Sequence, residues 1–281
     1  MTKIRKCAEA MLSTGVSKCP LDMKRVIGAI LVEPGTVLPA GITKEKLLEL
    51  CHADRPERIY PIFGFCNFTP NGGEVQTSAN GYGPTQASGM SPRSDTFDLA
   101  QADEGLHSSL LQCLNKKFDV YYFDEKDFIY GYNAGDGKLH GIPMASVFSN
   151  NPLFAGTDNA NMSVTFCYMD IRDWFEHYQF EKMDFDASRV CYGLTRVILK
   201  EVSSGKYKII EEIGGYDRTE EFGEAVQAGE GSVVIDGSAV SYDAGLISIT
   251  SENTPSLAAP SILYLADIKG IEYVGTEKLE A

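Results

Sequence analysis

Short runs of β-branched and aromatic residues recur along this chain, and residues that form turns separate them. The run 162–169 alternates, with Met, Val, Phe and Tyr on one face and Ser, Thr and Cys on the other. Two further runs, 118–123 and 128–132, flank an acidic turn and indicate a hairpin. Such runs bury their apolar side chains within or between sheets. We therefore predict a mainly β protein of the α+β class.

The first two thirds of the chain are predicted to form one β-rich domain with a lead-in segment. Residues 1–54 are expected to hold an N-terminal arm, a strand and a short helix that lead into this domain. Residues 55–187 are expected to form the domain itself, a β-sandwich or a barrel-like sheet. Its one packed helix is predicted over 103–115, where acidic residues precede an apolar stripe and two lysines follow it.

Residues 69–94 differ in composition from the rest of this domain, because Gly, Pro, Ser, Thr and Asn dominate them. This composition predicts a long loop. Loops of this length are uncommon inside compact domains, and they are usually functional or contact a partner. A flexible surface excursion is the alternative, and both interpretations stay open at this point. The preceding run 58–68 is predicted to be an edge or starting strand, because Pro61 lacks a backbone donor.

A domain boundary is predicted near residue 188, where the pattern of the sequence changes. Residues 188–281 hold short β-type runs with regularly spaced turns, including an Asp-Gly turn at 236–237 that is typical of hairpins. This pattern predicts an immunoglobulin-like β-sandwich.

The charge is strongly acidic and unevenly distributed. The formal net charge is −14, from 25 basic and 39 acidic residues. The stretch 1–30 carries six bases against two acids, whereas 200–281 carries six bases against 15 acids. An acidic body repels a phosphate backbone, so wrapping of nucleic acid is disfavoured. The basic N-terminal stretch is either a contact arm or a solvated terminal face.

The cysteines indicate a reducing environment. There are seven, an odd number, at wide spacings and with no Cys-x-x-Cys pair. We expect reduced, buried thiols that act as small apolar side chains. The first residues do not resemble a secretion signal, and no run of about 18 apolar residues predicts a membrane span. The protein is therefore expected to fold in the cytoplasm. The cysteines are Cys7, Cys19, Cys51, Cys66, Cys113, Cys167 and Cys191.

No residue pattern in the chain predicts catalysis, cofactor binding or metal binding. The phosphate-binding and dinucleotide-binding glycine motifs and the Gly-x-Ser-x-Gly motif are absent. The histidines, His52, His107, His140 and His177, lack metal-ligand or nucleophile–base spacing. Two acidic clusters could serve a glycosidase or bind calcium, but solvated surface acids are the favoured interpretation. They are Asp124, Glu125 and Asp127, and Glu176, Glu181, Asp184 and Asp186. We predict that the chain is not an enzyme and has no cofactor.

The hairpin at 118–132 is aromatic on both faces, so both faces are expected to be covered. The cover is either the chain's own helix at 103–115 or another subunit. Stacking of sugars on exposed aromatic rings is a third possibility. Its aromatic residues are Tyr121, Tyr122, Phe123, Phe128, Tyr130 and Tyr132.

The order of motifs over about 55–180 resembles virion structural proteins of tailed phages that infect Bacteroidetes, including the crAss-like phages. The motifs are Tyr-Pro-Ile-Phe-Gly (60–64), Asn-Gly-Tyr-Gly (80–83), Ser-Asp-Thr-Phe-Asp-Leu (94–99), Leu-Asn-Lys-Lys-Phe-Asp-Val-Tyr-Tyr-Phe-Asp (114–124), Gly-Lys-Leu-His-Gly (137–141) and the alternating run 162–169. The lead-in segment and the C-terminal domain lie outside this resemblance.

The resemblance implies a mechanical function in a tail-tube-type domain. Copies of the chain would join edge to edge into a homo-oligomeric ring or tube of the tail or connector, beside adjacent tail proteins. The edges near 58–68 and 118–132 and the loop 69–94 would make the contacts between copies. DNA would only pass through an acidic lumen. The expected location is the virion tail, after assembly in the host cytoplasm. The alternatives are a surface or carbohydrate-binding β-protein and, third, a carboxylate-based glycosidase.

Overall fold

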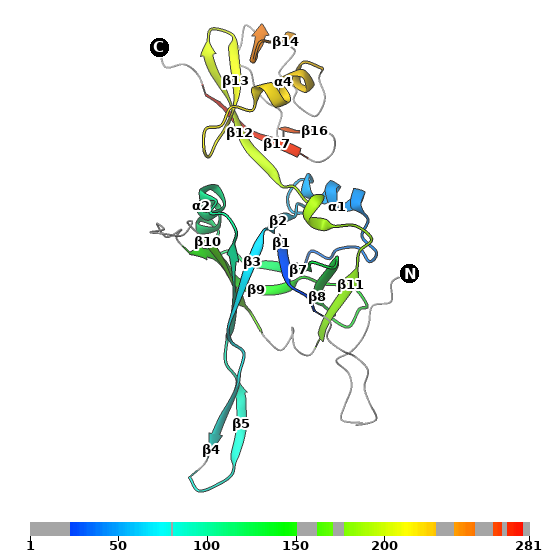
Figure 1. Ribbon diagram of the computed structural model, residues 1–281, viewed down its shortest axis with the longest axis vertical. Helices are drawn as coiled ribbons and strands as arrows, with labels where there is room; N and C mark the ends of the chain where they lie inside the picture. Colours follow the sequence, from blue (N-terminus) through cyan, green and yellow to red (C-terminus); the bar gives the residue numbers. More distant parts are fainter. Residues whose placement is uncertain are drawn as a thin grey trace. The chain divides into compact units, whose positions relative to one another are not determined.

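The computed structural model describes residues 23–79, 81–150, 162–170, 177–228, 239–250, 261–265 and 269–277. The fold is mainly β, as predicted, with a few short helices (Figure 1). The chain divides into two compact units. Unit 1 comprises Met1–Leu47 and Pro56–Arg189, and unit 2 comprises Leu48–Arg55 and Val190–Ala281. The division after Arg189 falls next to the expected boundary at 188, whereas Leu48–Arg55 groups with unit 2 instead of the lead-in segment.

Nine strands of unit 1 form one sheet, in the order β11-β8-β7-β9-β10-β6-β3, with β1 beside β7 and β2 beside β1. They are β1 (Val26–Val32), β2 (Tyr60–Phe63), β3 (Phe65–Gly72), β6 (Arg93–Leu99), β7 (Phe118–Asp124), β8 (Phe128–Tyr132), β9 (Ile142–Asn150), β10 (Met162–Tyr168) and β11 (Tyr178–Lys182). The described part of this unit also holds α1 (Lys44–Cys51), which the division of the units cuts, α2 (Glu104–Gln112), and the short 3-10 turn Ala187–Arg189.

Strand β7 lies at the centre of unit 1. All seven of its residues are buried. β1 pairs with one edge of β7 along its whole length, while β9 and β8 share the other edge, at residues 118–120 and 122–123. Both faces and both edges of β7 are therefore covered by this chain. The expected sheet edge at 118–132 is wrong, because β7 and β8 each pair with strands of this chain on both sides.

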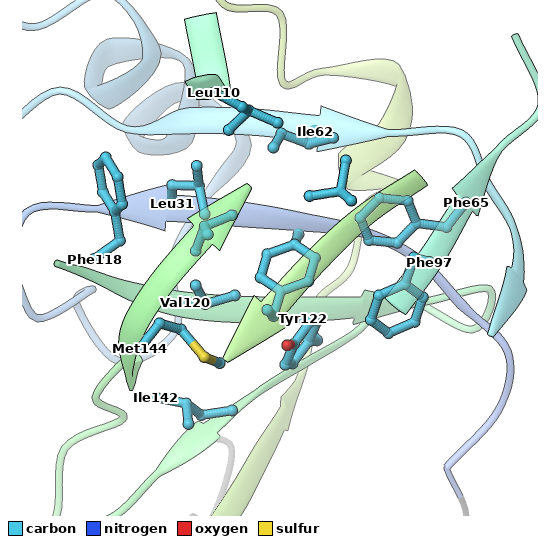
Figure 2. Close-up of a cluster of buried hydrophobic side chains, with 14 of the residues drawn as sticks. Leu31, Ile62, Phe65, Phe97, Leu110, Phe118, Val120, Tyr122, Ile142 and Met144 are labelled. Carbon is cyan, nitrogen blue, oxygen red and sulfur yellow. The ribbon is translucent and has the colours of Figure 1, made fainter. Parts of the chain in front are cut away.

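The main hydrophobic core gathers residues from both ends of the sheet (Figure 2). Ile62 comes from β2, whereas Phe65 and Phe97 come from β3 and β6 at the far end of the strand order. The sheet therefore curls around one cluster. Helix α2 packs on this cluster through Leu110, and Asp103 caps the helix by accepting a hydrogen bond from the Leu106 backbone N–H at 3.0 Å. The helix predicted at 103–115 is confirmed.

A loop after β1 covers the opposite face of β7. The Leu38 backbone N–H donates to the Tyr121 hydroxyl at 3.1 Å, and that hydroxyl lies 3.2 Å from the Leu139 carbonyl, which accepts from it. The Gly41 N–H donates to Glu181 Oε1 at 2.8 Å. Burial raises the pKa of the Tyr121 hydroxyl above its usual range. The loop therefore satisfies the polar groups that the buried strands would otherwise leave without partners.

The strands of unit 2 form one six-stranded sheet, in the order β14-β15-β13-β12-β17-β16. The β12–β17 pair is parallel. Helix α4 contacts β13, β14 and β15 and buries Phe222 and Val226 in the core of this unit. The elements are β12 (Leu194–Ser203), β13 (Lys206–Glu211), α4 (Thr219–Ala228), β14 (Ala239–Asp243), β15 (Leu246–Thr250), β16 (Ser261–Leu265) and β17 (Lys269–Glu277).

This arrangement differs from the expected immunoglobulin-like sandwich, in which two sheets face each other. In the described part of unit 2, a helix covers the sheet instead. Gly223 in the middle of α4 hides the helical pattern, since glycine is a poor helix former. Its lack of a side chain has a packing reason, because a Cβ there would lie 2.3 Å from Tyr242 Cδ2. The expected Asp-Gly hairpin at 236–237 lies outside the described residues.

Candidate functional site

A long two-stranded β-ribbon continues from β3 and β6 beyond the sheet (Figure 1). Its strands are β4 (Val75–Ala79) and β5 (Thr85–Met90), paired from Val75 opposite Met90 to Ala79 opposite Thr85. Hydrogen bonds between Glu74 and Ser91 join this pair to β3 and β6. We call residues 74–91 the ribbon. Every residue of β4 and β5 is exposed, so neither strand packs against the described body of unit 1.

The ribbon corrects the prediction of a structureless loop over 69–94. Residues 69–72 belong to β3 and 93–94 to β6, so only the middle of the segment leaves the sheet. The glycines predict a loop, yet Gly72, with a φ of +76°, still pairs with Arg93 at the end of the β3–β6 ladder, and a Cβ there would clash with the Pro92 carbonyl oxygen. Polar residues on both faces remove the alternation that signals a strand. A ribbon that contacts no core carries no such signal.

The surface of the ribbon is uncharged over most of its length and carries a few large apolar side chains. Glu74 is its only charged residue. Val75 and Met90 face each other at its base and are 60% and 37% exposed. Tyr82 lies at the tip and is fully exposed. Water surrounds these side chains in the single chain, although burying them in a contact is favourable.

The ribbon also presents unpaired strand edges. β4 and β5 form a sheet of their own with two strands, and β3 ends the strand order of the nine-stranded sheet. Among the described residues, the outer edges of β4 and β5 therefore pair with no further strand. An isolated two-stranded ribbon is marginally stable in water, and open edges are sites where another chain can add.

A pocket of about 560 Å³ lies at the base of the ribbon, beside β3 and β6. Five strands contribute to its lining: the start of β1 with the residues before it, the start of β3, one face of β6, and one tyrosine each from β7 and β10. We call it the base pocket. The lining residues are Met23, Lys24, Arg25, Val26, Cys66, Asn67, Phe68, Arg93, Asp95, Phe97, Tyr122 and Tyr168.

A hydrogen-bonded network forms the polar part of the base pocket. The Arg93 guanidinium donates to both oxygens of Asp95, at 2.8 and 3.3 Å. The Tyr168 hydroxyl donates to Asp95 Oδ2 at 2.7 Å and lies 3.4 Å from the Tyr122 hydroxyl. Burial raises the pKa of both tyrosines well above the usual range. The phenols therefore stay protonated, and the carboxylate is held by three hydrogen bonds.

The rest of the base pocket is aromatic. Phe97 is buried and packs on Phe68, with ring centroids 5.0 Å apart, and Phe68 is 45% exposed. The Arg93 guanidinium lies 5.9 Å from the Tyr168 ring centroid. Aromatic walls with a few fixed polar groups are typical of binding pockets. Because Asp95 is committed to its donors, the arrangement suits binding rather than proton transfer.

The base pocket was not predicted from the sequence, although the pattern of β6 contains an indication of it. On β6, Arg93 and Asp95 alternate with outward residues and share one face with Phe97, two residues further on. Charged residues on the apolar face of a strand indicate a buried polar network. Tyr122 was recognised as part of an aromatic hairpin, but its partner Tyr168 comes from a different strand that only the fold brings near.

Asp124 and His140, two of the acids and histidines considered above, have local structural roles. Asp124 accepts from the backbone N–H groups of Lys126 and Phe128 and from the Tyr130 hydroxyl, which closes the β7–β8 turn. His140 pairs with Asp136 at 2.9 Å. Among the described residues, no three His, Cys, Asp or Glu side chains gather to hold a metal ion. Glu176 lies outside the described residues.

The cysteines divide by exposure. Cys51 and Cys191 are buried and Cys113 and Cys167 are half-buried, whereas Cys66 is exposed at the base pocket. The prediction of buried thiols is therefore wrong for Cys66, which lies on the edge strand β3. The remaining two, Cys7 and Cys19, lie outside the described residues.

In comparisons with known proteins, no family model matches this chain and no curated protein matches it. None of the described helices is both long enough and apolar enough to span a membrane.

Proposed function

We propose that this chain is a non-enzymatic structural subunit that joins copies of itself into a ring or tube of a phage tail or connector. The exposed ribbon is the observation that carries this proposal. A two-stranded ribbon whose described strands are exposed throughout gains stabilisation when another chain covers it. The resemblance over 55–180 supplies the phage context.

The composition of the ribbon supports a contact between copies. Chains with a net charge of −14 repel one another, because every copy carries the same charge. The ribbon has one charged residue, Glu74, so it approaches a second copy with little of this repulsion. Its apolar residues Val75, Tyr82 and Met90 gain by leaving water.

The charge also suits the proposed passage of DNA. A lumen lined by acidic subunits repels the phosphate backbone, so DNA slides through without binding. The adjacent tail or connector proteins are the proposed further partners, and the virion tail is the proposed location.

A deletion tests the proposal. The variant lacks Val75–Met90 and joins Glu74 to Ser91, already hydrogen-bonded neighbours, through an Asn-Gly turn. We expect the wild-type chain to form rings or tubes in negative-stain images and in mass photometry. The variant should be monomeric, with a melting temperature within a few degrees of wild type, because the deleted residues contact no core. A matched control is Leu111→Ser, which removes an exposed apolar side chain from α2.

Two results would contradict the proposal. The first is a wild-type chain that stays monomeric, both alone and with co-expressed neighbouring virion proteins. The second is a deletion variant that still forms the same rings, which would move the contact away from the ribbon. Loss of folding on deletion would instead show that the ribbon stabilises its own domain.

A further inference from the structure

We infer that the tip of the ribbon, with Tyr82 as its anchor, docks into the base pocket of a second copy of this chain. This inference rests on the proposed self-association and specifies the two surfaces that meet. The tip is residues 81–84, Gly-Tyr-Gly-Pro. The receiving surface is the base pocket between the starts of β1 and β3.

The tip has the form of a single projecting side chain. Tyr82 is fully exposed and stands between Gly81 and Gly83, which have no side chains to obstruct its approach. Gly81 has a φ of +60°, and nothing lies within 4 Å of the position of its missing Cβ. Tyrosine is among the residues that most often anchor protein interfaces, since it buries a large rigid ring and keeps one hydroxyl.

The base pocket offers what a phenol needs. Its volume of about 560 Å³ exceeds that of one aromatic ring, so the flanking backbone of the tip also has room. Phe68 and Phe97 supply faces for aromatic packing. Arg93 lies at the polar end, with its side chain 16% exposed, and its guanidinium is the donor that the hydroxyl of an entering tyrosine meets there.

The base pocket is locally basic, and the tip that enters it is uncharged. The pocket lining holds Lys24, Arg25 and Arg93 against the one acid Asp95, so it is a positive site on an acidic protein. Arg25 also meets Glu125 at 3.6 Å, a pair that is exposed on both sides. Two copies with a net charge of −14 repel each other as whole molecules, and the positive lining lowers this repulsion where the tip approaches. The uncharged tip then makes the close contact without like-charge repulsion.

The tip of one chain cannot occupy the pocket of the same chain. The pocket lies at Phe68, near the start of the hairpin, and Tyr82 lies at its end. A strand rises about 3.3 Å per residue, so the ladder between them spans roughly 40 Å. In Figure 1 the ribbon extends away from β3 and β6. The contact therefore forms between copies.

A contact between two different surfaces has a defined consequence for assembly. Each copy gives one tip and receives one tip, so the contact is heterologous and repeats from copy to copy. Such contacts close into rings or continue as helical tubes. A contact between the same strand edge of two ribbons, by contrast, would pair identical surfaces and stop at a dimer.

Complementation between two defective variants tests this head-to-tail contact. Tyr82→Ala removes the tip anchor but keeps the pocket, and Asn67→Trp fills the pocket from an exposed position but keeps the tip. We expect each variant alone to be monomeric, with association weakened at least about 30-fold. A mixture of the two should give a heterodimer and nothing larger, because only one working tip and one working pocket meet. Phe68→Ala is a second pocket variant, and Tyr82→Phe should assemble with only a few-fold loss.

A disulfide trap locates the contact directly. Pro84→Cys places a thiol beside Tyr82, and the native Cys66 is exposed on the pocket wall. Under mild oxidation by dissolved oxygen with copper–phenanthroline, two thiols lose their hydrogens and form one S–S bond. We expect a ladder of cross-linked chains on a non-reducing gel. Peptide mapping should find the thiol introduced at position 84 joined to Cys66. The double variant Pro84→Cys with Cys66→Ser should give no ladder, and Ser88→Cys, away from the tip, should cross-link far less.

The possible results separate this inference from the proposed function. Wild-type assembly that Tyr82→Ala, Asn67→Trp and Phe68→Ala leave unchanged overturns the tip-and-pocket contact and leaves self-association standing. A mixture of Tyr82→Ala and Asn67→Trp that stays monomeric, although each variant is folded and wild type assembles, also overturns it. A wild-type chain that never associates overturns both.

Discussion

Asp95 shows how one buried carboxylate fixes a local structure. It accepts two hydrogen bonds from Arg93 and one from Tyr168, and it joins β6 to β10 across the sheet. Its side chain is 5% exposed and that of Arg93 is 16% exposed. A buried ion pair of this kind adds little net stability against an apolar pair, but removal of one partner leaves the other charge uncompensated.

We predict that Asp95→Asn destabilises unit 1 by about 2–4 kcal/mol, because Arg93 keeps its charge and loses its counter-ion. Urea denaturation followed by circular dichroism measures this change. Asp98→Asn on the same strand is the control, since Asp98 contacts the exposed Asn67 at 2.9 Å and should cost below about 1 kcal/mol. Equal stabilities of wild type and Asp95→Asn would show that the network does not hold the sheet.

The buried tyrosines predict a loss of stability at alkaline pH. The pKa of Tyr122 is raised in the folded chain by burial and by the charge of Asp95. Its phenol ionises in the unfolded chain from about pH 10 but stays neutral in the folded one. The stabilisation is therefore complete below about pH 10 and decreases as pH rises toward the raised pKa, by about 1.4 kcal/mol per pH unit for each such tyrosine.

Tyr122→Phe should therefore make the unfolding free energy fall less steeply with pH above about pH 10, by about 1.4 kcal/mol per pH unit. Denaturation curves at several pH values between about 9 and 11.5 give the slope, and the value at neutral pH gives the baseline cost of the substitution. A variant with the same slope as wild type would indicate that Tyr122 ionises equally in both states.

At the level of the elements, the sequence predicted those whose apolar residues face the core. The strand expected within residues 1–54, the helix at 103–115, the hairpin at 118–132 and the strand at 162–169 all have counterparts in the fold. Their patterns were readable because burial imposes a period of two or of 3.6 residues. The ribbon and α4 were missed, since glycine and polar residues interrupt the period in both.

The pairing of strands that are distant in the sequence could not be predicted from local hydrophobic periodicity either. β12 pairs in parallel with β17, and β1 inserts beside β7, although neither choice leaves a local trace in the sequence. The base pocket depends on such pairings, because it needs β1, β3, β6, β7 and β10 together. Its individual residue types were visible, but their meeting point was not.

The ribbon has a weak point where it leaves the sheet. Gly72 has a φ of +76°, and an added Cβ would meet the Pro92 carbonyl oxygen. We predict that Gly72→Ala destabilises this junction by about 1–3 kcal/mol and speeds amide hydrogen exchange in residues 65–72 and 93–99. Gly81→Ala is the matched control, because it shares a positive φ but meets nothing within 4 Å. Equal amide exchange rates in both variants would contradict the close approach of Gly72 to the Pro92 carbonyl.

For the whole molecule, charge sets the conditions for assembly. Copies with a net charge of −14 repel one another, whereas the proposed contact is mostly apolar. Added salt screens the repulsion and leaves apolar contacts intact. We therefore predict that association strengthens several-fold between about 0.05 and 0.5 M sodium chloride. Sedimentation velocity measures the shift, and dissociation by salt would instead indicate that ion pairs hold the copies together.

Mass photometry of the 281-residue chain tests self-association through the ribbon most directly. We predict oligomers at multiples of the 30.7 kDa chain mass, with one closed ring or long tubes as the dominant product. After deletion of Val75–Met90, only the monomeric species should remain. A wild-type chain that gives only the 30.7 kDa species would contradict self-association through the ribbon.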